Sequence, residues 1–355
     1  MTLHLFNPDH DIALDSNLEN FTPPHAARRL RGDLGIIPAI WMGEHDAVLV
    51  DDEAAAHSLW RSLSRKMVGR GTPRILTSTA LAKEPIDRIE PWGWDLALRR
   101  RLLRAGVGEH LLPSREQVSV IRQLSHRRTS SDLLPMLRME GTVGEARECG
   151  TVAYVRRQLD VWGSIVVKAP WSSSGRGVRF FSQTMTAQDE GWLNNVLSRQ
   201  GSVMAEPFYR KIKDFGMEFC CDAAGNVSYL GLSLFHTQNG AYTGNILAPE
   251  HAKRSMMEHY LPLSLLDSVR QRICEEGQRL FGGRYEGPFG VDMMVVGDHD
   301  GYLLHPCVEI NLRRTMGHVA LALSQAVNPE EDDERCAVMR ISCSEDRYRL
   351  RIVSL

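Results

Sequence analysis

One tract of the sequence combines residues that could hold a phosphate. It reads Ile165-Val-Val-Lys-Ala-Pro-Trp-Ser-Ser-Ser-Gly-Arg-Gly-Val178, so an apolar, β-branched run ends in Lys168 and opens into a loop of small residues. The loop carries Gly175, Arg176 and Gly177, and it offers unblocked backbone N–H groups and cations to an anion. A polyphosphate is the natural candidate, although the tract lacks the Gly-Lys-Ser/Thr ending of a P-loop. The plainer interpretation is a strand-to-strand turn beside a surface lysine.

Two carboxylates and an amide lie far downstream, in a pattern that suits a hard cation. The segments Gly290–Val296 and Tyr302–Asn311 are largely apolar and predict a β-hairpin. On a strand Glu309 and Asn311 share one face, because side chains two residues apart point the same way. Together with Asp292 they would supply the oxygen ligands that Mg²⁺ prefers, and Mn²⁺ could take the same site. The alternative is a set of solvated side chains on an outward face.

Whether Asp292 joins that face depends on the turn of the hairpin. A loop of five residues would place Asp292 on the face opposite Glu309. A loop of four residues would pair Gly297 with Tyr302 and Asp292 with Cys307, and so bring Asp292 to the face of Glu309. Hairpin loops of both lengths are common, so the shorter loop is predicted on chemical grounds.

The order of these motifs resembles the ATP-grasp superfamily. A basic residue, the lysine with its glycine loop, a Glu-Pro-aromatic hinge, an aspartate and a Glu-x-Asn-x-Arg run follow one another over about residues 119–325. The most specific part is Val308-Glu-Ile-Asn-Leu-Arg313. The resemblance implies a chain of α/β and α+β parts, in which two α+β subdomains clamp ATP. A preceding N-terminal α/β lobe would contribute the acceptor substrate site.

On this resemblance, the first half of the clamp holds the phosphates. Lys168 matches the family's strand-borne lysine that contacts ATP phosphates, and a compact ammonium suits a point contact with a phosphate. The residues that match the closing loop are Ser172, Ser173, Ser174, Gly175, Arg176 and Gly177. Arg127 sits where the family usually has a lysine or arginine near the α-phosphate. Arg128 could take that role instead, and a solvated helix face fits the sequence nearly as well.

The second half of the clamp would read the nucleoside. Met204–Phe208 resembles the hinge whose backbone reads the adenine edge, so Glu206 and Phe208 would lend main-chain groups. Asp214 is the candidate for the acid that binds the ribose hydroxyls, with Glu218 as its rival. For either residue, an ordinary loop or strand carboxylate is the plainer reading.

The resemblance also implies a reaction. Arg313 matches the family's arginine near the transferred phosphate, where its planar cation suits a pentavalent phosphoryl group; Arg314 competes for this role. With Lys168 it would serve an ADP-forming ligase, in which ATP activates a carboxylate as an acyl phosphate and an amine displaces the phosphate. The partners would be small-molecule carboxylates and amines, amino acids or peptides among them. A kinase with a hydroxyl acceptor and a non-catalytic ATP-binding protein are the alternatives.

Two polar segments stay without an assigned role at this stage. Asn7–Asp11 follows the first predicted strand, at the end where α/β folds commonly bind ligands. It is either part of the acceptor site or a turn rich in Asx caps. His236, Tyr242 and Asn245 lie in the segment 235–249, which either faces the substrate or forms a covering loop.

Four regions are expected to position these residues. They are an N-terminal α/β lobe at 1–118, a first ATP-grasp subdomain at 119–203, a second subdomain with the metal site at 204–327, and C-terminal strands at 328–355. In the first region, short apolar runs alternate with helical stretches, which predicts a parallel sheet with strands that include Leu3–Phe6 and Ile36–Trp41. A strand is also expected at 152–155. Ser114 begins a capping box, and another helix is expected to start at Thr186.

The composition excludes several classes of protein. The chain has 355 residues, a formal net charge of −2 and 43% hydrophobic residues, so it can bury a sizeable core and has no overall basic balance for nucleic acid. No run approaches the roughly 18 apolar residues of a membrane span, and the first residues do not resemble a signal peptide. The seven cysteines lack CxxC spacing and are expected to be reduced thiols. We therefore expect a cytoplasmic protein without nucleic-acid or membrane partners.

Overall fold

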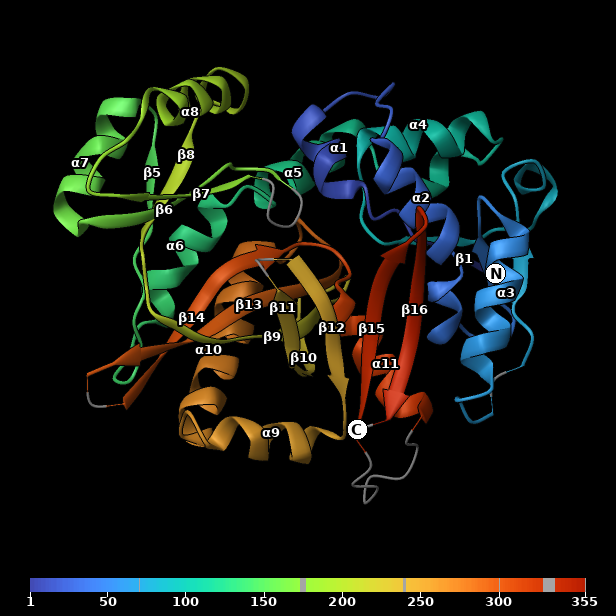
Figure 1. Ribbon diagram of the computed structural model, residues 1–355. Coiled ribbons are helices and arrows are strands. Elements are labelled where there is room, and N and C mark those ends of the chain that lie inside the picture. The colour runs from blue at the N-terminus through green and yellow to red at the C-terminus, as the bar shows by residue number, and fades with distance from the viewer. Residues whose placement is uncertain (70, 173–176, 239–240, 300, 328–335, 355) are drawn as a thin grey trace.

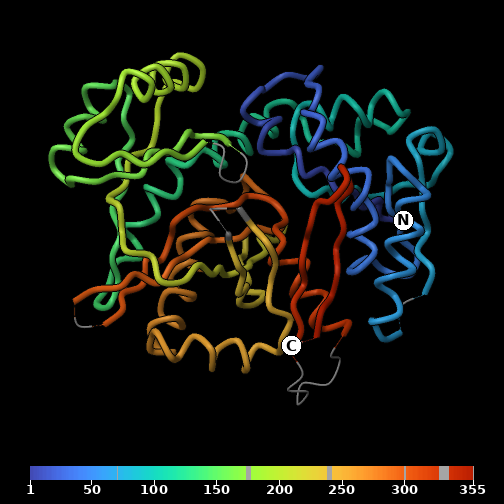
Figure 2. The backbone as a smooth tube through the Cα atoms, in the orientation of Figure 1, coloured from blue at the N-terminus to red at the C-terminus, as the bar shows by residue number. Residues whose placement is uncertain are grey.

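The chain folds into four sheets of four strands each. The computed structural model describes residues 1–69, 71–172, 177–238, 241–299, 301–327 and 336–354. Figure 1 shows the sheets with their helices, and Figure 2 follows the backbone through them. The last two strands lie beside the helices of the N-terminal lobe, whereas the sheet that carries Lys168 forms the lobe at the upper left.

The N-terminal lobe contains a parallel sheet, as its alternating pattern predicts. Its strands lie in the order β3-β2-β1-β4, and each neighbouring pair is parallel. The strands are β1 Thr2–Leu5, β2 Ala47–Leu49, β3 Arg74–Leu76 and β4 Arg88–Pro91. The helices are α1 His10–Ser16, α2 His25–Leu34, α3 Glu53–Ser64 and α4 Leu96–Arg104. Because β1 and β4 are parallel neighbours, the loops that follow them leave the same edge of the sheet side by side.

The sheet that carries Lys168 is antiparallel, with the strand order β5-β8-β6-β7. Its strands are β5 Arg147–Cys149, β6 Ser164–Lys168, β7 Val178–Ser182 and β8 Val203–Pro207. Helices α5 Arg115–Leu124 and α6 Arg128–Leu137 precede this sheet, and α7 Val152–Trp162 and α8 Ala187–Gln200 pack against it. The capping box at Ser114 is confirmed, and Thr186 begins α8 with another.

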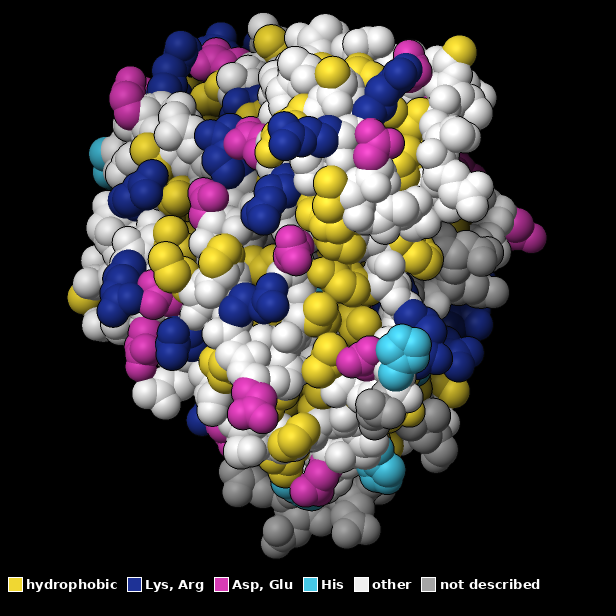
Figure 3. Space-filling view, turned by 90° about the vertical axis from the view of Figure 1, so that its left-hand side faces the viewer, with side chains coloured by type: hydrophobic (Ala, Val, Ile, Leu, Met, Phe, Trp, Pro, Cys, Tyr) yellow, Lys and Arg dark blue, Asp and Glu magenta, His cyan; other side chains and the backbone are white. Residues whose placement is uncertain are grey.

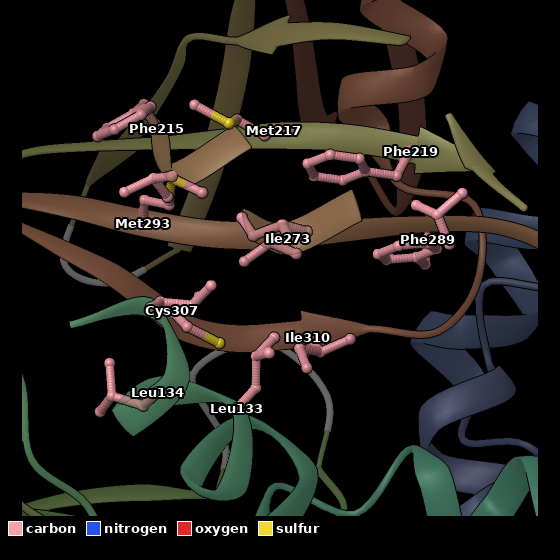
Figure 4. Packing of buried hydrophobic residues seen from close by; sticks show 14 of the residues in the cluster. Leu133, Leu134, Phe215, Met217, Phe219, Ile273, Phe289, Met293, Cys307 and Ile310 are labelled. Atoms are coloured by element: carbon pink, nitrogen blue, oxygen red, sulfur yellow. The ribbon is translucent and has the colours of Figure 1, made fainter. Parts of the chain in front are cut away.

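The third sheet carries the predicted metal residues, in the order β10-β9-β13-β14. Its strands are β9 Lys211–Cys221, β10 Val227–Ser233, β13 Gly287–Asp298 and β14 Gly301–Asn311. Helix α10 Leu263–Phe281 and helix α6 cover one face of this sheet, and their side chains join its core (Figure 4). Gly282 follows α10, as predicted from the Gly-Gly pair after the helix. The other face of the sheet carries the predicted metal residues Asp292, Glu309 and Asn311.

A fourth sheet joins distant parts of the chain, in the order β11-β12-β15-β16. Its strands are β11 Phe235–Gln238, β12 Ala241–Leu247, β15 Ala337–Ser344 and β16 Arg347–Ser354. The remaining helices are α9 Glu250–Glu258 and α11 Met316–Val327. Met339 and Ile352 of this sheet share a buried cluster with Val48 and Trp60 of the N-terminal lobe. The two C-terminal strands therefore tie the N-terminal lobe to the rest of the molecule.

Two short segments predicted as strands are helical. Ile37–Ile40 is a 3-10 helix rather than part of a strand at Ile36–Trp41, because Pro38 sets a helical φ near its start. Residues 152–155 begin α7, since the Thr151 side chain caps that helix. Apolar runs of this length fit either structure, so hydrophobicity alone does not separate them.

The outer surface mixes charges of both signs. Seen from the left-hand side of Figure 1, basic and acidic side chains are interspersed, and a band of hydrophobic side chains runs between them (Figure 3). Such a face produces no large field of one sign. Within the described ranges, no helix combines the length and apolar character that crossing a membrane requires.

Candidate active site

Strands β9, β13 and β14 present two chemically different faces. Phe215, Met217 and Phe219 of β9 point into the core, where they meet Val291 and Met293 of β13. Between these residues, along the same strands, the side chains point to the opposite face. That face carries the polar residues Glu218, Asp292, Glu309 and Asn311. The period of two along each strand thus separates a packing face from a polar face.

The hairpin brings the three predicted metal residues together. Asp292 lies directly opposite Glu309, and the Asn311 amide donates to Asp292 Oδ2 at 3.0 Å. The predicted pairing of Gly297 with Tyr302 is confirmed, but the pairing of Asp292 with Cys307 is wrong.

An irregularity in the ladder explains the difference. Between the Met294–His305 pair and the Asp292–Glu309 pair, β14 contains two more residues than β13. A shift of two keeps side chains on the same face, whereas a shift of one would have reversed it. The predicted face is therefore correct although the predicted partner is not.

Asp292 lies in surroundings that oppose its negative charge. Burial raises the pKa of Asp292 to about 8, and the nearby Glu309 and Glu218 carboxylates add to the effect. Among the residues that the structure describes, no three His, Cys, Asp or Glu side chains gather as a metal site. The set of two carboxylates and one amide fits a hard cation that takes its other ligands from phosphate oxygens and water, as Mg²⁺ usually does.

Lys168 lies at the contact between the two sheets of the clamp. Its side chain is only 7% exposed, and Nζ donates to Glu206 Oε2 at 2.6 Å and to the Val308 carbonyl at 3.4 Å. The surface-lysine interpretation is therefore wrong. The ammonium sits between β8 of its own sheet and β14 of the β10-β9-β13-β14 sheet.

Arg127 connects the glycine loop to the metal residues. Its Nη1 donates to the Ala169 carbonyl and, at 2.8 Å, to Ser172 Oγ, while Nη2 donates to Glu309 Oε1 at 2.7 Å. Arg128 instead pairs with Glu148 at the surface. Of the two candidate arginines, Arg127 thus lies in the site.

The closing loop is described only at its two ends. Ser172 accepts from Arg127, and the Gly177 carbonyl accepts from the Ala169 N–H at 2.7 Å, so the ends of the loop are held close together. A side chain at Gly177 would collide with Ser172. Ser173, Ser174, Gly175 and Arg176 lie outside the described residues.

The hinge residues Glu206 and Phe208 already have hydrogen-bond partners within the protein. The Glu206 side chain pairs with Lys168, and the Phe208 N–H already donates to the Ser164 carbonyl at 2.9 Å. The Phe208 ring is 55% exposed and packs edge to face on Phe180. The adenine-reading role of this backbone therefore stays a prediction.

The two acids considered for the ribose have different surroundings. Asp214 accepts from Lys211 at 2.6 Å and from Thr237 at 3.0 Å near the surface. Glu218 is buried at 2% exposure and accepts from Thr315 Oγ1 at 2.8 Å. Glu218 belongs to the polar network around Asp292, whereas Asp214 lies toward the outer end of the same face.

Arg313 is held by a residue from the other end of the chain. Its Nε and Nη2 donate to the two carboxylate oxygens of Asp11 at 2.8 and 2.7 Å, and Nη2 also donates to Asn311 Oδ1 at 3.0 Å. Burial opposes ionisation of Asp11, but the Arg313 guanidinium outweighs it and holds the pKa of Asp11 below its usual value. Asp11 is the site residue that the sequence analysis did not assign, and its signal was the polar Asn7–Asp11 tract after β1. Arg314 instead pairs with Glu90.

The segment 235–249 supplies strands rather than a loose cover. Asn245 is fully buried on β12, where it donates to Ser233 Oγ at 2.9 Å and accepts from the Tyr242 hydroxyl.

His305, on the polar face of β14, is 1% exposed, and neither ring nitrogen has a partner among the described residues. Burial, with the nearby Lys168 ammonium, lowers the pKa of His305 to about 3, so its ring is neutral.

Comparisons with known proteins identify the fold. No family model and no curated protein matches the chain. Among solved structures, a biotin carboxylase from Campylobacter jejuni in an ATP-type complex is 13% identical, with a TM-score of 0.52, and the match covers 96% of this chain and 75% of that one. An N5-carboxyaminoimidazole ribonucleotide synthetase bound to ADP is 12% identical, with a TM-score of 0.50 and coverages of 96% and 81%. A putative ATP-grasp superfamily protein from Archaeoglobus fulgidus matches at 16% identity, with a TM-score of 0.47 and coverages of 100% and 99%.

Likenesses at this level of identity show the fold alone, and they agree with the order of the sequence motifs. The chain has the ATP-grasp fold, with an α/β lobe before the clamp.

Proposed function

We propose that the protein is an ATP- and Mg²⁺-dependent ligase that joins a carboxylate to an amine and releases ADP and phosphate. One observation carries the proposal: the cationic side chains of Lys168 and Arg127 reach the hairpin that carries the carboxylates of Asp292 and Glu309. Lys168 reaches β14, and Arg127 contacts Glu309 directly. A binding face of this kind suits a polyphosphate together with a hard cation.

The cations would exchange their present partners for phosphate oxygens. Lys168 now pairs with Glu206, and Arg127 with Glu309. Both guanidinium and ammonium groups bind phosphate through charge-assisted hydrogen bonds, so ATP would replace carboxylate contacts with contacts of the same kind. Mg²⁺ held by Asp292, Glu309 and Asn311 would neutralise charge on the terminal phosphates.

The proposed ligase reaction has two steps. An oxygen of the substrate carboxylate attacks the γ-phosphorus, the bond to the β–γ bridging oxygen breaks, and ADP leaves. The amine nitrogen then attacks the acyl carbon, the bond to the phosphate oxygen breaks, and the nitrogen loses a proton. Arg313, fixed by Asp11, would stabilise the transferred phosphoryl group.

The test is ADP release in the presence of carboxylates and amines, offered singly and in pairs. We expect release only when both substrates are present, together with an amide product. Asp292→Asn should abolish it, whereas Asp298→Asn, an exposed aspartate on the same strand, should not. A stable phosphorylated product would instead indicate a kinase. Binding of Mg·ATP without any stimulated ADP release would indicate a non-catalytic protein.

A further inference from the structure

A cavity of about 430 Å³ lies in the N-terminal lobe, outside the clamp. Asn7 and Asp9, which follow β1, and Asp95, which follows β4, form part of its wall. The chain runs from β1 through β2 to β3 on one side and places β4 on the other, so the strand order reverses between β1 and β4. Open parallel sheets bind ligands at this reversal, outside the carboxyl ends of the strands. We call this space the switch-point cavity.

Its mouth carries cations that the protein does not neutralise. Arg100 and Arg104 of α4 line the cavity and are exposed. Arg104 donates to the neutral amide oxygen of Asn20 at 2.8 Å, and Arg100 makes no ion pair within the described part of the chain. They lie four residues apart on one helix face, so both can reach a single anion.

The other charges around the cavity are already paired. Arg31 and Arg101 share the carboxylate of Asp51. The acid Glu19 pairs with Arg115. Asp95 caps α4 by accepting from the Leu98 N–H at 2.8 Å. Among the described residues, the positive charges on the cavity lining that have no acidic partner are therefore those of Arg100 and Arg104 on α4.

The opposite part of the wall offers a carboxylate. Asp9 is only 5% exposed, and Arg31 Nη1 donates to both of its carboxylate oxygens at 3.3 Å. Burial raises the pKa of Asp9 despite that contact. A ligand amine would give this carboxylate a second cationic partner and a shorter hydrogen bond than the 3.3 Å contacts with Arg31. Asp9 also lies two residues before Asp11, which holds Arg313 in the clamp, so the acidic wall is the part of the cavity nearest to the clamp in sequence.

We propose that the switch-point cavity binds a zwitterion of the amino-acid class, with its carboxylate at Arg100 and Arg104 and its amine toward Asp9. The volume lies within the range of about 300–1,000 Å³ that is typical of small-molecule sites. Its role as the amine acceptor of the ligase rests on the proposed function. Binding itself does not, because it needs neither ATP nor turnover.

The experiment measures binding to the whole protein without nucleotide. Each of the standard L-amino acids is tested by thermal shift and titration calorimetry, and each active one is compared with its methyl ester and its N-acetyl derivative. We expect at least one amino acid to bind, and both derivatives to bind at least about tenfold more weakly, because each lacks one charge. Inorganic phosphate serves as the probe for a simple anion site.

Variants test the end of the cavity that would bind the ligand carboxylate. Arg100→Gln/Arg104→Gln should weaken binding at least about tenfold, whereas the exposed pair Arg156→Gln/Arg157→Gln on α7 should leave it unchanged. Unfolding temperatures of the free variants show that folding is intact, since all four arginines are exposed.

Three results would overturn the inference: no amino acid binds, the double variant of α4 binds as wild type, or phosphate binds as tightly as the best amino acid. If the wild-type protein binds an amino acid but shows no substrate-stimulated ADP release, the result contradicts the proposed function alone. ADP release that is unchanged in the α4 variant would contradict the acceptor role alone.

Discussion

The two faces of the β9–β13–β14 sheet differ in what they contribute. On one face Phe215, Met217 and Phe219 pack with α10 and α6, and burial of such side chains stabilises the fold by about 1.5–3 kcal/mol each (Figure 4). On the other face Asp292 lies opposite Glu309, and burial together with that nearby carboxylate disfavours the charged state of Asp292. The same strands thus combine a face that stabilises the protein with a face that holds a carboxyl group in unfavourable surroundings.

The largest effect is expected from the polar face. Asp292→Asn removes one carboxylate ligand of the proposed cation, so turnover should fall at least about a hundredfold. The free energy of unfolding without ligands should stay the same or rise, because a neutral amide has no buried charge to stabilise, whereas burial disfavours ionisation of the Asp292 carboxyl. ADP release and urea unfolding measure the two quantities. A variant that loses activity because it is less stable than wild type would contradict the distinction between the faces, and Asp298→Asn is the matched control.

The packing face should show the reverse behaviour. Ile273 of α10 is fully buried among these side chains, so Ile273→Ala should lower the free energy of unfolding by about 2–5 kcal/mol. Ile273→Val should cost about 0.5–1.5 kcal/mol, because it removes a single methylene group. Below the unfolding temperature, both variants should bind Mg·ATP as wild type does. An affinity for Mg·ATP that falls in step with stability would show that the two faces are not independent.

The packing face is the part of this sheet that could be predicted most directly. Alternation along each strand identifies which residues point inward, whereas the Gly297–Tyr302 pairing was predicted from the chemistry of the metal ligands, since two turn lengths fitted the sequence. The partner of Asp292 could not be predicted, because an irregularity of two residues leaves no mark in hydrophobicity. That error did not change the face, since the shift was even.

The rest of the site could not be predicted from the sequence, because it depends on contacts between residues that are far apart along the chain. Arg313 and Asp11 are 302 residues apart, and Arg127 and Glu309 are 182 apart. Spacing within a motif carries no information about such pairs, so the motif order indicated the clamp but not the residue of the N-terminal lobe that completes it. The helical errors at Ile37–Ile40 and 152–155 have a local cause instead, because short apolar runs are ambiguous.

An effect smaller than that of Ile273→Ala is expected where the polar face meets the N-terminal lobe. Asp11→Asn leaves the Arg313 guanidinium without its carboxylate, and since the two side chains keep 25% and 15% exposure, the loss should be about 1–3 kcal/mol at neutral pH. The pKa of Asp11 is lowered in the folded protein, so this contribution is present above the unfolded value of about 3.9 and is lost as the pH falls through the lower folded value. The difference between wild type and variant should therefore be constant from neutral pH down to about pH 5 and shrink below about pH 4. Urea unfolding at several pH values measures it, with the exposed Asp160→Asn as control. A difference that persists unchanged into strong acid would mean that the Asp11 side chain stabilises the lobe contact by packing rather than by charge.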